Sequence, residues 1–179
     1  MDLSTITLIL GAAAVAGGVV GVVKTERLIV FLKGFPRSVS VGVALTLIAT
    51  AWFVYNLSQE SIADFAAFKD KLLLGFAALG IMTCIYVKDY LGSRGLALVM
   101  LLLANEMVNA ARWEETPWRL VITTWAYVMA VGGMWFTISP WRVRDLIEWV
   151  TVSPQKVKQL SMVRIGLGVG LLALGALVY

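Results

Sequence analysis

The chain contains 179 residues, of which 60% are hydrophobic and only 15% are charged, and its formal net charge is +4. Because soluble domains carry about 25% charged residues, this composition excludes an ordinary water-soluble domain. It indicates instead an all-α integral membrane protein in which residues 1–179 form a single membrane domain.

Two residue types that support much of protein chemistry are scarce. The sequence has no histidine, and Cys84 is its only cysteine. This scarcity argues against histidine-bound haem or metal, cysteine-ligated clusters and intrachain disulfides. We therefore expect no cofactor and no metal site. The basic residues are spread over short loops without a nucleic-acid motif, so we also expect no nucleic-acid partner.

Apolar runs that approach the length of a membrane span recur along the chain. About 20 apolar residues cross a hydrocarbon core of about 30 Å. The first run follows Asp2 with no basic residue before it, so we expect a retained span and not a secretory signal peptide. The sequence predicts six transmembrane helices, at residues 5–23, 39–57, 72–87, 95–111, 119–138 and 163–179.

The basic residues are divided unevenly between the two sets of connectors. Most of them lie in the connectors after the first, third and fifth spans. Because positively charged loops stay in the cytoplasm, this distribution places those connectors inside and both termini outside. It indicates a bacterial-type inner (plasma) membrane. The residues concerned are Lys24, Arg27, Lys33, Arg37, Lys88, Arg94, Arg142, Arg144, Lys156, Lys158 and Arg164.

The connectors after the first and fifth spans resemble each other. Leu28 to Pro36 aligns with Leu146 to Pro154, and an apolar segment follows each. Apolar residues at helical spacing predict amphipathic helices over 25–35 and 139–150, both lying in the membrane interface. The similarity favours a parallel repeat of helical hairpins. Its units would be residues 5–57 and 119–179, on either side of a central hairpin at 72–111.

Glu106 stands out because it lies inside an apolar run. At 1.5 Å per residue it is about 16 Å into the fourth span, where an ionised carboxylate is costly unless it is paired or hydrated. Asn105, Asn109 and Arg112 lie close to it on the same helix. This intramembrane polar cluster can exchange protons or coordinate a cation during transport. Alternatively, Glu106 is protonated or bonded to Asn109 and to hydroxyls of neighbouring spans, and it holds helices together.

The turn KDYLGSRG, at residues 88–95, combines glycines with basic residues. Backbone N–H groups around Gly92 and Ser93, together with Lys88 and Arg94, can bind an anion or a lipid headgroup. A tight turn with the usual positive charges of a cytoplasmic loop explains the same residues without a ligand.

Two pairs of glycines are spaced four residues apart. Gly17 and Gly21 form one pair in the first span, and Gly166 and Gly170 form the other in the last span. This spacing permits helices to approach closely in a membrane. The motif fits packing within the chain, and it fits a contact with another subunit equally well.

The short loops leave no room for a soluble catalytic domain, and the cytoplasmic acids are scattered, so we expect no enzyme. The sequence predicts a non-catalytic accessory or scaffold subunit of a larger membrane protein complex. Its partners would be membrane lipids and other membrane subunits or further copies of itself. The alternative is a small oligomeric ion, proton or solute transporter or channel that uses Asn105, Glu106 and Asn109.

Overall fold

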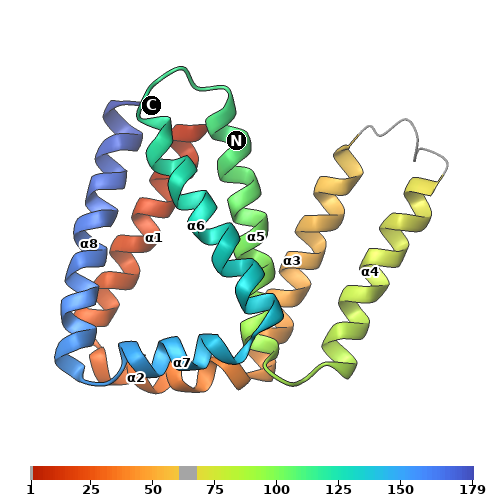
Figure 1. The fold of residues 1–179 in the computed structure, drawn as a ribbon, viewed down its shortest axis with the longest axis horizontal. Coiled ribbons are helices and arrows are strands. Elements are labelled where there is room, and N and C mark those ends of the chain that lie inside the picture. The colour runs from red at the N-terminus through yellow and green to blue at the C-terminus, as the bar shows by residue number, and fades with distance from the viewer. Residues whose placement is uncertain (1, 61–67) are drawn as a thin grey trace. The chain divides into compact units, whose positions relative to one another are not determined.

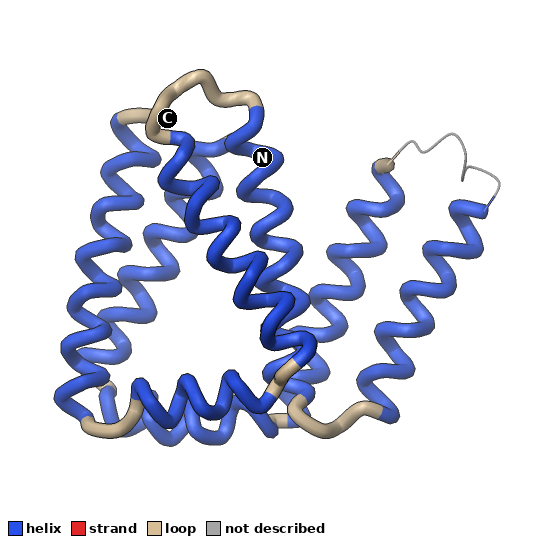
Figure 2. Tube along the Cα trace, in the orientation of Figure 1, coloured by secondary structure: helices blue, strands red, loops and turns tan. Residues whose placement is uncertain are grey.

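Helices account for all the regular structure of the described residues (Figures 1 and 2). The computed structural model describes residues 2–60 and 68–179, and within these ranges it contains no strand. The all-helical prediction is therefore confirmed there. In chain order the elements are α1 (Leu3–Val23), α2 (Thr25–Gly34), η1 (Phe35–Arg37), α3 (Val39–Gln59), α4 (Lys69–Tyr86), α5 (Leu91–Arg112), α6 (Arg119–Ile138), α7 (Trp141–Val150) and α8 (Pro154–Leu177).

Five of the described helices, namely α1, α3, α5, α6 and α8, are long and apolar enough to cross a membrane. They coincide with five of the six predicted spans, which is consistent with a membrane protein. α4 has 18 residues, but its first turn contains Lys69, Asp70 and Lys71. Its apolar part is shorter than the span of about 20 residues that a membrane requires. A sixth crossing therefore stays a prediction.

The start of α8 shows where hydropathy misjudges a helix. The Lys156 amide donates to Ser153 Oγ over 3.2 Å, which takes up one of the amides that a first turn leaves without a helical acceptor. Pro154 follows as the first helical residue, a position that suits proline. α8 therefore begins at Pro154. The predicted span began only at Val163, because the first turns of the helix are polar and hydropathy does not detect them.

Both connectors that were predicted as amphipathic helices are helical. α2 and α7 are each 10 residues long. In Figure 1 they run across the direction of α1 and α8. This orientation suits a surface helix, although the location in a membrane interface stays a prediction.

The chain forms two compact units. Unit 1 consists of Met1–Gly34, Leu103–Val131 and Arg144–Tyr179, and unit 2 consists of Phe35–Leu102 and Gly132–Val143. α5 and α6 are each divided between the units, with one end in unit 1 and the other end in unit 2. The organisation into a single membrane domain with two repeat units stays a prediction.

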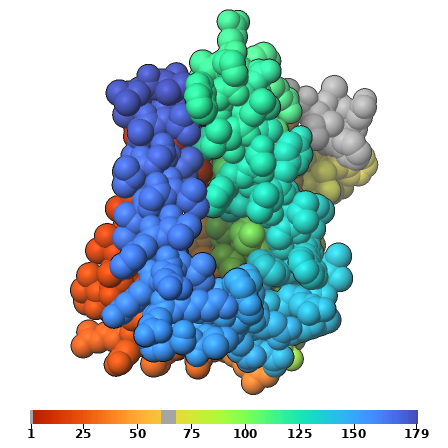
Figure 3. All heavy atoms as spheres, turned by 60° about the vertical axis from the view of Figure 1, so that its left-hand side comes forward, coloured from red at the N-terminus to blue at the C-terminus, as the bar shows by residue number. Residues whose placement is uncertain are grey.

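The pairing of α1 with α8 is the main feature of unit 1. The two helices lie side by side and run in opposite directions (Figures 1 and 3). Near the start of α1, Ser4 Oγ donates to the Gly175 carbonyl over 2.7 Å. The start of α1 also packs against the parts of α5 and α6 that belong to this unit. The buried residues of that core are Leu3, Ile6, Ala104, Met107, Ala111, Ile122 and Ala126.

Glycines allow α1 and α8 to approach closely. A Cβ atom added to Gly11 would lie 2.9 Å from the carbonyl oxygen of Gly168 and 3.0 Å from the amide nitrogen of Leu172. Real Cβ atoms essentially never make non-bonded contacts shorter than 3.0 Å, so these backbone atoms leave no room for a methyl group. The backbones can come this close only where a side chain is missing. The glycines buried in these two helices are Gly11, Gly18, Gly21, Gly168 and Gly175.

The glycine pairs that the sequence indicated contribute unequally. Gly21 is buried against Ser161 of α8, and Gly17 faces a flexible side chain of the same helix. Gly166 and Gly170 are exposed, and a Cβ atom at either would meet nothing within 4 Å among the described residues. Neither glycine therefore takes part in packing among residues 2–60 and 68–179. A contact of these two glycines with another subunit stays a prediction.

Unit 2 is organised around α3. The rings of Phe53 in α3 and Phe76 in α4 meet edge to face, with centroids 4.9 Å apart. A Cβ atom added to Gly42 of α3 would meet the backbone of Leu91, the first residue of α5. α4 contains no buried residue. Its apolar side chains therefore remain largely exposed in unit 2.

We expect Gly11→Ala to destabilise the protein, because the added methyl group meets backbone atoms of α8. Overpacking of this kind costs about 1–3 kcal/mol. Gly170→Ala is the matched control, since there the methyl group enters open space on α8. The free energy of unfolding can be measured in detergent micelles by the loss of helical circular dichroism as SDS is added. Equal stabilities of the two variants would contradict the close contact between α1 and α8.

Candidate functional site

Glu106 lies on α5 beside the start of α1. Its side chain is half-buried, and it lines a pocket of about 290 Å³. α1 and the residue before it contribute one wall of this pocket, and the last turns of α5 contribute another. The lining residues are Asp2, Leu3, Glu106, Asn109, Ala110, Trp113 and Glu114.

The structure places Glu106 beside the start of a neighbouring helix, and its depth in a membrane stays a prediction. Counting along α5 alone places Glu106 well inside a span. In unit 1, however, the α1 residue that shares its pocket is Leu3, where that helix begins, together with the preceding Asp2. Glu106 therefore lies at the level of a helix end. A carboxylate is favoured there, because the free amides of a first turn give a helix N-terminus a partial positive charge.

The structure brings together only part of the predicted polar cluster. Asn109, about one helical turn from Glu106, lines the same pocket. Asn105 and Arg112 are exposed, and neither lines this pocket. Their positions on α5 turn them to other faces of the helix.

Asp2 and Glu114 are the site residues that sequence reasoning missed. Both lie outside the predicted spans, where acidic residues are ordinary. Their position in the sequence could have indicated that they lie close together, because both fall at the outer ends of spans in the predicted topology. With Glu106 they give the pocket three carboxylates, which attract cations. In residues 2–60 and 68–179, however, no group of three acidic, histidine or cysteine side chains can hold a metal ion.

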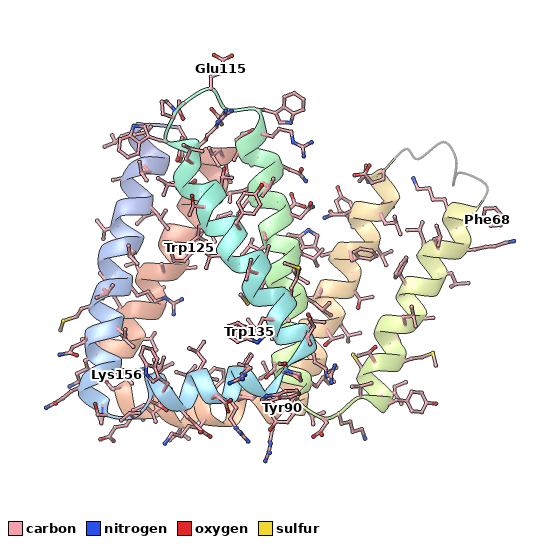
Figure 4. All side chains as sticks on the ribbon, viewed as in Figure 1. Phe68, Tyr90, Glu115, Trp125, Trp135 and Lys156 are labelled. Carbon is pink, nitrogen blue, oxygen red and sulfur yellow. The ribbon has the colours of Figure 1, made fainter. Side chains whose placement is uncertain are left out.

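Tyr179 fastens the end of α8 to the loop between α5 and α6. Its hydroxyl donates to the Trp118 carbonyl over 2.6 Å, and in the same region the Arg119 guanidinium donates to the Glu114 carbonyl over 2.6 Å. Burial raises the pKa of the Tyr179 hydroxyl, and the charge of Glu114 raises this pKa further. The hydroxyl therefore stays protonated and able to donate. Glu115, at the tip of this loop, points away from the helices (Figure 4).

The predicted anion site at the start of α5 is in part a packing contact. Gly92 and Ser93 are buried, and a Cβ atom added to Gly92 would collide with the Phe35 carbonyl oxygen. Both residues therefore take part in packing within unit 2, and a role in binding a lipid headgroup stays a prediction. Lys88 is exposed and Arg94 is half-buried. Headgroup contact through these two side chains stays a prediction.

The turn before α5 is held in place by Tyr90 (Figure 4). Its backbone φ of 54° lies in the left-handed region, which few residues other than glycine adopt. The Arg37 guanidinium donates to the Tyr90 hydroxyl over 3.2 Å and lies 5.3 Å from the centre of its ring. This contact ties η1 to the residues that lead into α5. Arg37 therefore has a structural role in addition to its positive charge.

Comparison with known proteins does not supply a function. No protein-family model matches the chain, and neither a curated protein nor a solved structure matches it. The function is therefore argued from the geometry of its own residues.

Proposed function

We propose that this protein is a non-catalytic accessory or scaffold subunit of a larger complex in a bacterial-type inner membrane. In this proposal the long helices α1, α3, α4, α5, α6 and α8 cross the membrane. α2 and α7 lie in the cytoplasmic interface, and both termini face outside, as the positive-inside rule requires. Its partners are membrane lipids and other membrane subunits.

The exposed apolar surface of the helices carries this proposal. Only 17% to 39% of each of the five apolar segments is buried within the described residues. Soluble proteins rarely expose contiguous apolar patches larger than a few hundred Å². Lipid tails and partner helices are the surroundings that such a surface tolerates.

α4 gives the specific reason to expect partner subunits and not lipid alone. It has no buried residue, and its side chains at Leu74 and Tyr86 are 73% and 76% exposed. A short apolar helix surrounded by lipid forces the bilayer to thin, and a neighbouring protein helix removes that cost. A partner helix packed against α4 would cover its exposed side chains, and it would also remove the cost of thinning the bilayer.

The acidic residues of α7 support a non-catalytic role. Arg144 lies 3.0 Å from the Asp145 carboxylate and 3.6 Å from the Glu148 carboxylate. Both carboxylates are therefore paired on the surface of the helix. Catalytic carboxylates instead converge on a pocket that can hold a substrate.

A transporter or channel is the second candidate, because the pocket at Glu106 is lined by several carboxylates. In this alternative, Glu106 and Asn109 would receive a proton or a cation, with Asn105 nearby on α5. The position of the pocket at the start of α1 suits the entrance of a pathway better than its centre. A pathway also needs further polar groups deeper between the helices.

The subunit proposal predicts that the protein copurifies with larger partners. Native membranes would be solubilised in a mild detergent, and the tagged protein isolated from them. We expect a particle much larger than one 19.5 kDa chain, with other polypeptides present in fixed proportion. A single chain or a homo-oligomer would contradict the proposal.

Glu106→Gln distinguishes the two candidate functions, because glutamine keeps the shape of the side chain but carries no charge. As a subunit, the wild-type protein in vesicles should conduct neither protons nor cations, and the variant should change only stability or retention of partners. As a transporter, the wild-type protein should conduct, and Glu106→Gln should abolish the flux. Glu115→Gln, on the exposed loop, is the matched control. Flux that survives in Glu106→Gln would rule out this site for transport.

A further inference from the structure

A basic pocket lies at the corner where α1 passes into α2, beside the start of α8. Its volume is about 560 Å³. Lys24, Arg27 and Lys158 line it, together with a single carboxylate from Glu26. The side chains therefore give the pocket a positive charge.

These three cations are not held in ion pairs. Lys24, Arg27 and Lys158 form no ion pair with any described residue. Nearby basic residues differ in this respect. Arg144 is paired with acids on α7, and the Lys156 ammonium (Figure 4) lies 3.5 Å from the centre of the Trp149 ring. The cations that line the pocket are therefore free to bind an external anion.

The backbone adds to the positive charge of the pocket. α2 begins at Thr25, and the amides of a first turn favour anions. The opposing negative end of α1 is largely neutralised. The Thr25 hydroxyl donates to the Gly21 carbonyl over 2.8 Å and to the Val22 carbonyl over 3.2 Å, and the Lys24 amide donates to the Val20 carbonyl over 2.8 Å.

We infer that this pocket binds the phosphate group of an anionic membrane lipid. The phosphate of such a lipid is a diester that carries one negative charge and has oxygens that accept hydrogen bonds, which suits lysine and arginine side chains beside a helix start. The inference rests on the proposed membrane location, which puts this corner at the depth of the cytoplasmic headgroups.

The apolar part of the lining favours a lipid over free phosphate. Val22 and Val23 form part of the wall, and Val23 is 71% exposed. Free phosphate gains nothing from this surface. A lipid places its glycerol and the first part of its acyl chains next to its phosphate, so it covers both the cationic and the apolar lining.

The test is a titration of the full chain in detergent with fluorescent phosphatidylglycerol, with phosphatidylcholine as the neutral lipid and inorganic phosphate as competitor. We expect Lys24→Gln and Lys158→Gln each to weaken phosphatidylglycerol binding about fivefold, the usual effect of one basic residue near an anionic surface. Lys33→Gln is the matched control, because Lys33 is an exposed cation on the last turn of α2 and does not line the pocket.

Each result of this titration decides the question. Selective losses in Lys24→Gln and Lys158→Gln, without competition by millimolar phosphate, support a lipid site. Equal losses in Lys33→Gln show attraction to the general surface charge and overturn the site. Effective competition by inorganic phosphate overturns the choice of a lipid. Because the assay uses the isolated chain, its failure is distinct from a failure to copurify with partner subunits.

Discussion

The close approach of α1 and α8 is the constraint on which unit 1 depends. Their backbones meet where Gly11 faces Gly168, and no side chain fits between them there. The pairing is antiparallel, so the start of α1 lies beside the end of α8, and the end of α1 lies beside the start of α8. The Glu106 pocket occurs at the first of these ends, and the basic pocket occurs at the second. Only the basic pocket is lined by residues of both helices, whereas the Glu106 pocket is lined by α1 and α5.

The helices could be predicted from hydropathy. The glycine pairs spaced four residues apart, however, do not predict which faces of α1 and α8 meet. The four-residue spacing at Gly166 and Gly170 pointed to a face of α8 that is exposed. The buried glycines follow a different spacing, since Gly11 precedes Gly18, and Gly168 precedes Gly175, by one heptad. A seven-residue repeat is the period at which two helices remain in contact along a shallow left-handed crossing. That signal was present in the sequence. It was less conspicuous because further glycines, Gly17 and Gly170, lie within these intervals.

The candidate sites show a second limit, which concerns neighbouring helices. Hydropathy indicates only how far Glu106 lies along its own helix. It does not show where the neighbouring helix begins. Asp2 reaches the pocket through the packing of α1 on α5. At the start of α5 the sequence likewise showed Gly92 and Ser93 but not the nearby carbonyl of Phe35, which explains why a small residue is required there.

The charged side chains at the two ends of α1 differ in how far the helix itself explains them. At its start, Glu106 lies where the helix itself favours a negative charge, so the carboxylate has a structural reason to be there. At its end, Lys24 and Arg27 also suit the negative end of α1, but the last carbonyls of that helix already accept bonds from Thr25 and from the Lys24 amide. Lys158 lies on α8 and forms no ion pair with a described residue, although the Glu26 carboxylate lines the same pocket. Three cations and one carboxylate leave the pocket with a positive charge, which an anion from outside the chain would balance.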